Sequence, residues 1–371
     1  MAFSFRKFSK KALIITNLLV ALVFLLTLLL PTTNPQTYWW LGLFGLIFPY
    51  LLIAMVLFLF FWIVVKPKYC LLSLLPILLS WKQVSVIFSF RQDNFQFVKR
   101  SSALRVMTWN VKIFEGLEKG GGQEAASNIF GYVKALMPDV VCMQEFSQYD
   151  SNGLAGNHVK RMKDLGYPYS FFSKDYIKKT VNYQSGVVIF SRLPLFDTTR
   201  VPYEHGRESL LYADLVKNND TLRIYTTHLQ SFRFSQNDYR YIEDVKDHGD
   251  VVNTANKNFL VKMKNAFQLR AEQADEIRAL VDSCPFPEIV CGDFNSVPNS
   301  YAYWQIRGSR RDAFMESGFG LGRTFISLAP TLRIDYILCD NRLTVDQFTV
   351  GNKRYSDHWP VIADIRYEKK P

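Results

Sequence analysis

Two long runs without a charged residue lie within the first 65 residues of this 371-residue chain. They cover residues 12–30 and 38–65, and each is long enough to cross the roughly 30 Å apolar core of a bilayer as a helix. A cleaved signal peptide is the alternative for the first run, because basic residues precede it. That run ends in three leucines and a proline without the small residues of a cleavage site, so the sequence predicts a retained membrane anchor.

Basic residues around these runs predict their orientation, because lysines and arginines beside a span stay on the cytoplasmic side. Basic residues precede the first run, residues 31–37 between the runs are uncharged, and Lys66 and Lys68 follow the second run. Both outer ends of the two spans are therefore expected in the cytoplasm. A third apolar stretch, residues 69–90, leaves two alternatives: as a third span it exports the rest of the chain, and as a surface segment it leaves the rest cytoplasmic. We favour three spans.

A polar connector at residues 91–102 joins the predicted membrane segment, residues 1–90, to a domain at residues 103–371. This domain is long enough to bury a substantial core. The chain has a formal net charge of +11, which favours anionic partners such as nucleic acid, phospholipid headgroups or phosphorylated sugars. An integral, multi-pass membrane protein with one large domain is therefore expected, in contact with the lipid bilayer and with a phosphorylated anionic substrate.

Six short motifs with acidic, amide or histidine side chains are spread over this domain, most of them where an apolar run ends. They are Thr-Trp-Asn at 108–110, Gln-Glu at 144–145, Thr-His-Leu at 227–229, Gly-Asp-Phe-Asn at 292–295, Arg-Ile-Asp at 333–335 and Ser-Asp-His at 356–358. Short apolar runs predict buried strands, whose ends present functional groups in open sheets. Asp293 and Asn295 are two apart, so the period of a strand places them on one side. Asp335 lies inside an apolar run and needs a partner, because burying an unpaired carboxylate is costly.

The side chains of these motifs are mostly oxygen donors, with a few histidines. Carboxylate and amide oxygens without a cysteine or histidine cage suit Mg²⁺ or Mn²⁺ better than zinc. Hydrolysis of a phosphoester needs a cation or arginine on the nonbridging oxygens, a group that orients or deprotonates water, and stabilisation of the leaving oxygen. The motifs contain residue types for each task, so the sequence favours a metal-dependent hydrolase of phosphate esters.

The ordered set of motifs resembles the endonuclease/exonuclease/phosphatase (DNase I-like) superfamily over about residues 102–367. This superfamily includes nucleases, neutral sphingomyelinases and inositol polyphosphate phosphatases. The resemblance implies Mg²⁺ as the cofactor, with Mn²⁺ as a substitute. It further implies that Glu145 is the principal metal ligand, with Asn110 and Asp357 nearby.

The same resemblance implies roles for five catalytic residues. Asp293 would activate the attacking water or stabilise the transition state, and Asn295 would position the phosphate. Asp335 would orient His358, while His358 and His228 would bracket the scissile phosphate. Which histidine acts as the acid and which as the base stays open.

Two further positions resemble phosphate-contacting residues of DNase-like members. Arg207, within Gly-Arg-Glu-Ser, is similar to a phosphate-binding arginine, and Tyr183 is similar to a strand tyrosine near the phosphate. The chain also departs from the pattern, because DNase-like nucleases carry a carboxylate that orients the first histidine where this chain has Ser185. The orienting partner of His228 is therefore open.

Other residues capable of chemistry are expected to be structural. Three histidines outside the motifs, His158, His205 and His248, lie in polar surroundings without a strand context, which favours surface positions. Cys142 and Cys291 lie inside apolar runs and are expected as small core residues. The five cysteines match neither a disulfide framework nor a zinc site.

The alternation of strands with helices, together with the resemblance, predicts an α/β (α+β) fold: a two-layer β-sandwich flanked by helices and preceded by a transmembrane helical segment. Residues 210–216 and 222–227 are expected to form an antiparallel hairpin. Helices are expected at 124–136 and 261–282. The polar, irregular segment 232–259 follows the motif of His228, so we expect it to border the mouth of the site and to shape substrate choice.

Two classes of function are consistent with these features. The first is a membrane-anchored, Mg²⁺-dependent phosphodiesterase or phosphatase, for which tethering favours a phospholipid headgroup over genomic DNA. A DNA endonuclease or exonuclease at the membrane is the alternative within this class. The second class is a noncatalytic scaffold that retains the fold, which the complete set of motifs disfavours.

Overall fold

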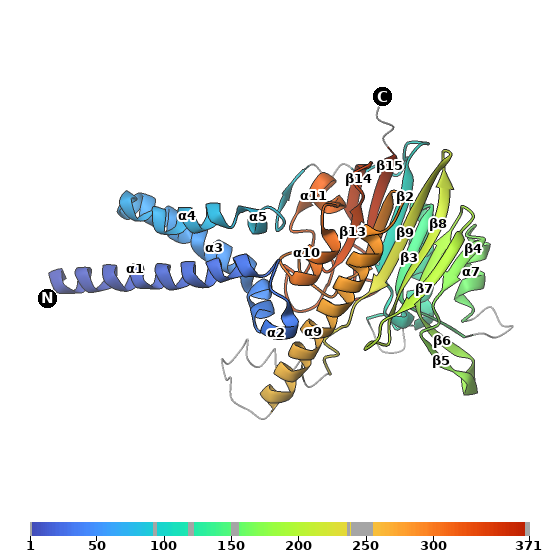
Figure 1. The fold of residues 1–371 in the computed structure, drawn as a ribbon, viewed down its shortest axis with the longest axis horizontal. Helices are drawn as coiled ribbons and strands as arrows, with labels where there is room; N and C mark the ends of the chain where they lie inside the picture. Colours follow the sequence, from blue (N-terminus) through green and yellow to red (C-terminus); the bar gives the residue numbers. More distant parts are fainter. Residues whose placement is uncertain are drawn as a thin grey trace.

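Two stacked β-sheets form the centre of the chain after residue 103 (Figure 1). The computed structural model describes residues 2–91, 95–117, 122–149, 156–235, 238 and 255–367. The six-stranded sheet contains, in spatial order, β11 (Arg311–Asp312), β13 (Asp335–Cys339), β10 (Glu288–Asp293), β9 (Asp220–His228), β8 (Ser209–Lys217) and β7 (Phe196–Pro202). The seven-stranded sheet contains β14 (Leu343–Val350), β15 (Val361–Tyr367), β2 (Leu104–Asn110), β3 (Val140–Tyr149), β6 (Tyr183–Ser191) and β4 (Tyr169–Phe172), with β5 (Tyr176–Lys178) also paired to β6.

The main core lies between the two sheets. Val106, Val140 and Ile189 of the seven-stranded sheet are fully buried against Leu211 and Ile224 of the six-stranded sheet. Neighbouring residues along each strand point to the outer faces, where helices cover them. Both faces are therefore buried, which explains why these strands are continuous apolar runs. The predicted two-layer sandwich flanked by helices is confirmed.

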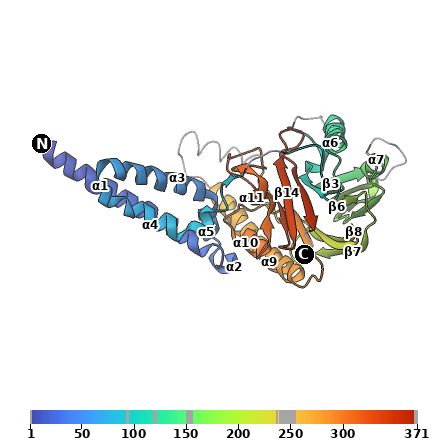
Figure 2. The same ribbon diagram turned by 90° about the horizontal axis from the view of Figure 1, so that it is seen from above.

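Helices cover the outer face of each sheet (Figure 2). α6 (Gly122–Leu136) and α7 (His158–Asp164) pack on the seven-stranded sheet, where Ile129 and Phe130 contact the cluster of Met107 and Trp109. α9 (Ala255–Asp282) and α10 (Tyr301–Arg307) pack on the six-stranded sheet. The two long helices expected from the sequence are thus present and begin a little earlier than predicted.

The strands β8 and β9 form the predicted antiparallel hairpin, and its turn is shorter than the sequence suggests. Lys217 pairs with Asp220, which leaves Asn218 and Asn219 as the two turn residues. Both have positive φ angles, +53° and +69°, as a two-residue turn of type I′ requires. Asparagine tolerates this left-handed conformation better than most residues. The strand β9 ends at His228, the first residue of the candidate site.

Residues 2–84 form a helical bundle that projects away from the sheets (Figures 1 and 2). Its helices are α1 (Ala2–Leu26), α3 (Leu41–Val65), α4 (Leu71–Leu79) and α5 (Trp81–Val84). Two segments, Ser9–Leu29 and Leu41–Val65, are long and apolar enough to cross a membrane. Inside the bundle, Asn17 accepts a hydrogen bond from Trp62 Nε1 at 2.9 Å and donates one to Ser73 Oγ at 3.0 Å. The third apolar stretch, residues 69–90, does not form one long helix. It contains the two short helices α4 and α5.

Within the described residues, the bundle and the segment that follows it both pack on the carboxy-terminal domain, and two of these contacts are specific. At the first, α2 (Pro35–Tyr38) lies against α9, and Gln36 Nε2 donates to Glu272 Oε1 at 2.8 Å. At the second, β1 (Ser89–Phe90) pairs with β12 (Phe319–Gly320), and Arg333 Nη2 donates to the Val86 carbonyl at 2.9 Å. The domain is thus held by more than the polar connector that the sequence suggests.

Candidate active site

The adjacent parallel strands β2 and β3 place Asn110 and Glu145 side by side. Asn110 pairs with Gln144 in the register of the two strands. The register of β3 shifts between Met143 and Phe146, and within this bulge Glu145 has a φ of +49°. A bulge redirects a side chain out of the regular alternation. The Glu145 carboxylate therefore reaches Asn110, whose Nδ2 donates to Glu145 Oε1 at 3.0 Å.

Three strands of the other sheet bring His228, Asp293 and Asp335 together. Asp293 pairs with His228 of the parallel strand β9 and with Asp335 of the antiparallel strand β13. Gly292, with φ +138°, makes this possible, because a Cβ there would lie 2.0 Å from the carbonyl oxygen of Thr227. Only glycine allows such a close approach of β10 to β9.

Asp293 lies at the centre of the resulting cluster and joins the two sheets. Asn110 Nδ2 donates to Asp293 Oδ2 at 3.0 Å. The same oxygen lies 3.6 Å from His228 Nε2 and 3.7 Å from His358 Nε2. His228 Nε2 is also 3.8 Å from Glu145 Oε1. Four of these side chains are buried, while Glu145 is 37% exposed, so the cluster is open to solvent at Glu145.

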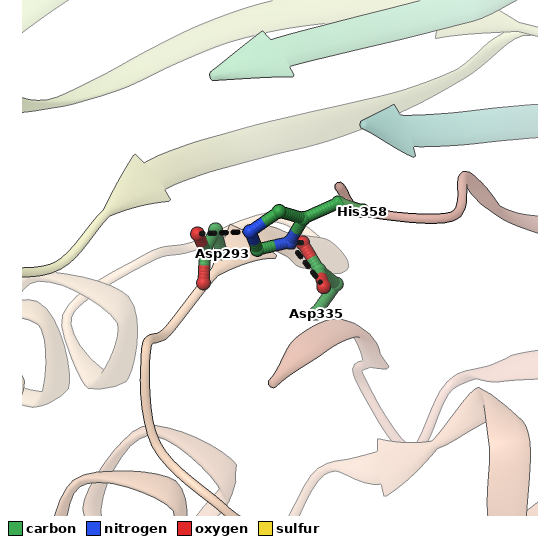
Figure 3. A group of neighbouring side chains, drawn as sticks. All are labelled: Asp293, Asp335 and His358. Atoms are coloured by element: carbon green, nitrogen blue, oxygen red, sulfur yellow. Dashed lines mark hydrogen bonds and ion pairs between the residues drawn. The ribbon is translucent and has the colours of Figure 1, made fainter. Parts of the chain in front are cut away.

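His358 is bound by Asp335 on one side and faces Asp293 on the other (Figure 3). Its Nδ1 lies 2.9 Å and 3.1 Å from the two carboxylate oxygens of Asp335. Burial alone would lower the pKa of His358, but the charges of Asp335 and Asp293 outweigh it and raise that pKa to about 10. His358 is therefore an imidazolium at neutral pH, with Nε2–H directed at Asp293.

His228 and Asp293 are electrostatically linked as well. Burial lowers the pKa of His228, yet the carboxylates of Asp293, Glu145 and Glu208 raise it above its ordinary value. Burial raises the pKa of Asp293, partly offset by the two histidines. His228 Nε2 is buried and has no hydrogen-bond partner among the described residues. Such a buried, unpartnered nitrogen beside two acids is suited to contact a substrate oxygen.

Asn295 is held tightly beside Asp293 at the end of β10. Its backbone N–H donates to Asp293 Oδ1 at 2.8 Å, and its Nδ2 donates to the Leu229 carbonyl at 2.9 Å. The residue has a φ of +49°, a left-handed conformation that asparagine adopts more readily than most residues. The expectation that Asp293 and Asn295 share one side thus agrees with the geometry, although a turn rather than strand alternation brings it about.

The predicted metal ligands Glu145, Asn110 and Asp357 lie around the exposed side of the cluster. Ser356 Oγ donates to the Asn110 carbonyl at 2.8 Å, which holds the neighbouring Asp357 close to Asn110. The Asp357 carboxylate pairs with Lys112 Nζ at 3.3 Å. Carboxylate and amide oxygens beside a half-exposed acid fit a hard divalent cation. In the present rotamer Asn110 turns its amide nitrogen, not its oxygen, toward Glu145.

A second group that could hold an ion lies deeper in the site. Asp293, Asp335 and His358 each offer a ligand atom within 4.8 Å of the others. His358 Nδ1 and Asp335 are already bonded to each other, which makes them a hydrogen-bonded pair rather than free ligands. The more open position beside Glu145 therefore suits a cation better.

Arg207 and Tyr183, the two residues predicted to contact the phosphate, lie apart from this cluster. Arg207 is exposed in the loop before β8, and no contact within the described ranges joins its guanidinium to the side chains of the cluster. Tyr183 packs its ring 5.3 Å from that of Tyr149. Together with Ser147 it lines an open pocket of about 680 Å³ beside the β3 bulge. Tyr183 thus lies at the border of the site, not within it.

Three residues that sequence reasoning missed also surround the site. Lys112 pairs with Asp357, and its position two residues after Asn110 was a usable signal. Glu208 raises the pKa of His228, and it lies in the same short motif as Arg207. Arg270 of α9 donates from Nη1 to the Asn295 carbonyl, and nothing in the sequence of this amphipathic helix distinguishes it.

Two expectations for the surroundings of the site need comment. His158 is wrong as a surface histidine, because it is only 9% exposed and its ring packs against Phe114, Phe130 and Phe146. The segment 232–259 falls largely on residues 236–254, which lie outside the described residues apart from Asp238, as does His248. Its expected role at the mouth of the site therefore stays a prediction.

Comparison with known proteins agrees with this geometry. The profile of the "Endonuclease/Exonuclease/phosphatase family" matches residues 107–358, and a "Domain of unknown function" profile matches residues 10–87. No curated protein matches the chain by sequence. The chain belongs to the endonuclease/exonuclease/phosphatase family and is a phosphoester hydrolase of the nuclease and phosphatase kind.

Solved structures of the same fold are distant in sequence. An endonuclease/exonuclease/phosphatase from Beutenbergia cavernae DSM 12333 is 21% identical, with a TM-score of 0.51 and coverage of 72% of each chain. The human nocturnin catalytic domain with bound sulfate is 18% identical, with a TM-score of 0.51 and coverage of 73% of this chain and 97% of that one. A family protein from Leptotrichia buccalis C-1013-b is 15% identical, with a TM-score of 0.50 and coverage of 71% and 100%. At these identities the likeness demonstrates the fold alone.

Proposed function

We propose that this protein is a membrane-anchored, Mg²⁺-dependent phosphoester hydrolase that acts on substrates at the bilayer surface. The observation that carries the proposal is the convergence of Asn110, His228 and His358 on Oδ2 of Asp293, with Glu145 in contact with Asn110 and His228. Two acids, an amide and two imidazoles in one partly open cluster suit the neutralisation of a phosphate and the activation of water.

Glu145, Asn110 and Asp357 would hold the metal ion. An Mg²⁺ ion held there would supply positive charge that offsets the negative charge of the phosphate. Mn²⁺ has similar ligand preferences and is expected to substitute. Asn110 would turn its side-chain oxygen toward the cation, since its nitrogen cannot act as a ligand.

We assign Asp293 as the base, because His358, with a pKa raised to about 10, is protonated at neutral pH, and the neighbouring carboxylates raise the pKa of His228 as well. The raised pKa of Asp293 makes it a better proton acceptor than an exposed carboxylate. The water oxygen forms a bond to phosphorus as its proton passes to Asp293, and the bond from phosphorus to the leaving oxygen breaks. His228, whose Nε2 is unpartnered among the described residues, is placed to donate a proton to that leaving oxygen.

The position of the domain relative to the bundle supports export. At one end of the bundle, the Nζ atoms of Lys10 and Lys68 lie 5.1 Å and 5.2 Å from the Tyr69 ring. At the other end, Asn34 and Gln36 contact α9 of the domain. The basic end belongs in the cytoplasm by the positive-inside rule, so the domain is assigned to the opposite side of the membrane.

The third apolar segment would then return the chain across the bilayer. Leu71–Leu79 and Trp81–Val84 span only about 21 Å if helical throughout, at roughly 1.5 Å per residue. The flanking residues of η2 (Pro67–Tyr69) and of 85–88 would have to cover the remaining depth. A membrane-impermeant maleimide tests this in intact cells, with Lys68→Cys and Asn219→Cys in a chain lacking Cys70 and Cys284. Labelling of Asn219→Cys alone is expected; labelling of Lys68→Cys alone would contradict export.

Tethering favours a phospholipid headgroup as substrate, with DNA as the competing candidate. The full chain in lipid nanodiscs should be incubated with Mg²⁺ and either anionic or choline phospholipids, and separately with supercoiled plasmid. Headgroup release that is lost in Asp293→Ala but retained in Asp164→Ala, an exposed acid on α7, supports the proposal. Plasmid nicking without headgroup release would make the protein a tethered nuclease instead.

A further inference from the structure

Arg270 is a buried cation next to the active site that the reaction scheme does not use. It is 1% exposed, although it lies on α9, whose neighbouring turns are partly exposed. Its Nη1 donates to the carbonyl oxygen of Asn295, and its Nε donates to the Ala266 carbonyl at 3.1 Å. Nη2 has no hydrogen-bond partner among the described residues. A buried guanidinium without a carboxylate partner is costly, so its retention calls for a reason.

Two aromatic rings enclose this guanidinium. The Arg270 Cζ lies 4.3 Å from the ring centre of Phe232 and 5.0 Å from that of Phe267. Such contacts offset part of the cost of burying the charge and restrict the side chain to one direction. That direction leads to the Asn295 carbonyl, two residues beyond Asp293. Arg270 therefore fixes the peptide group that follows Asn295.

The backbone conformation of Asn295 determines the geometry of the catalytic turn, residues 293–296. Asn295 has a φ of +49°, and in this conformation its N–H reaches Asp293 Oδ1 and its side chain reaches the Leu229 carbonyl. A charged donor on the carbonyl oxygen makes a stronger hydrogen bond than a neutral one. Arg270 can thus hold the turn in the conformation that orients Asp293.

The membrane anchor contacts Phe267, one of the two rings that enclose the Arg270 guanidinium. Gly42, at the beginning of α3, packs so closely on Phe267 that a Cβ there would lie 2.8 Å from a ring carbon. Gly42, Phe267 and Arg270 also line one cavity of about 20 Å³, together with Ser296 from the catalytic turn. A continuous series of contacts therefore leads from α3 through Phe267 and Arg270 to Asn295.

We propose that Arg270 is a positioning residue for the Asp293–Asn295 turn, and that the anchor keeps Arg270 in place through the contact of Gly42 with Phe267. The anchor then supports the active site as well as tethering it. Catalytic groups require supporting side chains of this kind, because small displacements of a reacting group are costly in rate. This inference rests on the proposed function for its kinetic consequences.

Substitution of Arg270 tests the first part in the full chain in nanodiscs. Arg270→Met keeps most of the apolar volume and removes the donor, so kcat for a generic phosphodiester should fall about ten- to hundredfold with little change in KM. Arg270→Lys keeps one charged donor and should recover part of kcat. A kcat for Arg270→Met within about twofold of wild type would overturn the proposal.

Substitution of Gly42 tests the second part, with a matched control. Gly42→Leu forces Phe267 to move, whereas Gly131→Leu makes the same change in α6 where nothing lies within 4 Å of the new Cβ. Gly42→Leu, and not Gly131→Leu, should lower kcat in the same manner as Arg270→Met.

Hydrogen exchange at residues 293–296 separates this inference from the proposed function, because it requires no turnover. Faster exchange there in Arg270→Met and Gly42→Leu is expected even if the assayed substrates are wrong. Unchanged exchange in both variants would overturn the inference whatever the activity.

Discussion

The Nδ1 atom of His358 lies 2.9 Å from Oδ2 of Asp335, so one imidazole nitrogen is fully engaged and only Nε2 faces the reaction centre. The charge of Asp335 is also the largest single influence that raises the pKa of His358 against the effect of burial. Asp335 thus controls both the orientation and the charge of this histidine.

Asp335→Asn should lower kcat by about two to four orders of magnitude, because the amide neither stabilises the imidazolium nor fixes its orientation. The fold should be retained, since the amide has nearly the shape of the carboxylate. Steady-state kinetics and a thermal melt check these two outcomes. Asp346→Asn is the control: this acid on β14 pairs with Arg366 and not with a histidine of the site, so normal kcat is expected.

Glu145→Gln should abolish the stabilisation of the protein by Mg²⁺. At a free Mg²⁺ concentration 100 times its Kd, bound ligand stabilises the folded state by about 2.7 kcal/mol, which raises Tm by roughly 5–10 °C for a domain of this size. Thermal melts with Mg²⁺, with Mn²⁺ and with a chelator measure the effect. Glu124→Gln, at an exposed position on α6, should respond to metal like the wild type. An equal rise of Tm with metal in both variants would show that Glu145 is not a metal ligand.

Gly292→Ala should destabilise the fold by about 2–4 kcal/mol and reduce activity. A methyl group there would lie 2.0 Å from the Thr227 carbonyl, so β10 must move away from β9 and separate Asp293 from His228. Gly131→Ala is the control, because that glycine is in an open helix position and alanine should add about 0.5–1 kcal/mol of stability. Urea unfolding measures the free energy of unfolding of both variants, which should fall in Gly292→Ala and rise in Gly131→Ala.

His158→Gln should remove part of the pH dependence of stability. Burial lowers the pKa of His158 to about 4, below its ordinary value of about 6.5. Because the folded-state pKa is depressed, the neutral ring stabilises the fold above pH 6.5, and this contribution is lost as the pH falls from 6.5 towards 4. The loss is worth about 2–3 kcal/mol. Tm measured from pH 4 to 8 should fall less steeply at the acidic end in His158→Gln; parallel curves would speak against a buried neutral histidine.

The sandwich, its hairpin and its flanking helices could be predicted because they depend on local patterns. Apolar runs of strand length and one amphipathic helix stripe are visible in the sequence whatever lies opposite them. His158 escaped prediction because its neighbours along the chain are polar, while the rings that bury it come from three other elements. The division of the third apolar stretch into α4 and α5 was equally hidden, because hydropathy does not report where a helix ends.

The sequence by itself determined the family, the two long apolar helices and the identity of the acids, amides and histidines, since these are properties of residue type and order. Only the tertiary structure decided how they meet. Asn110 and Asp293 are 183 residues apart and belong to different sheets, yet they share a hydrogen bond of 3.0 Å. The β3 bulge turns Glu145 toward Asn110, and the packing of α9 brings Arg270 to the carbonyl of Asn295. Such contacts depend on the close packing of whole sheets and helices, and no local pattern in the chain encodes them.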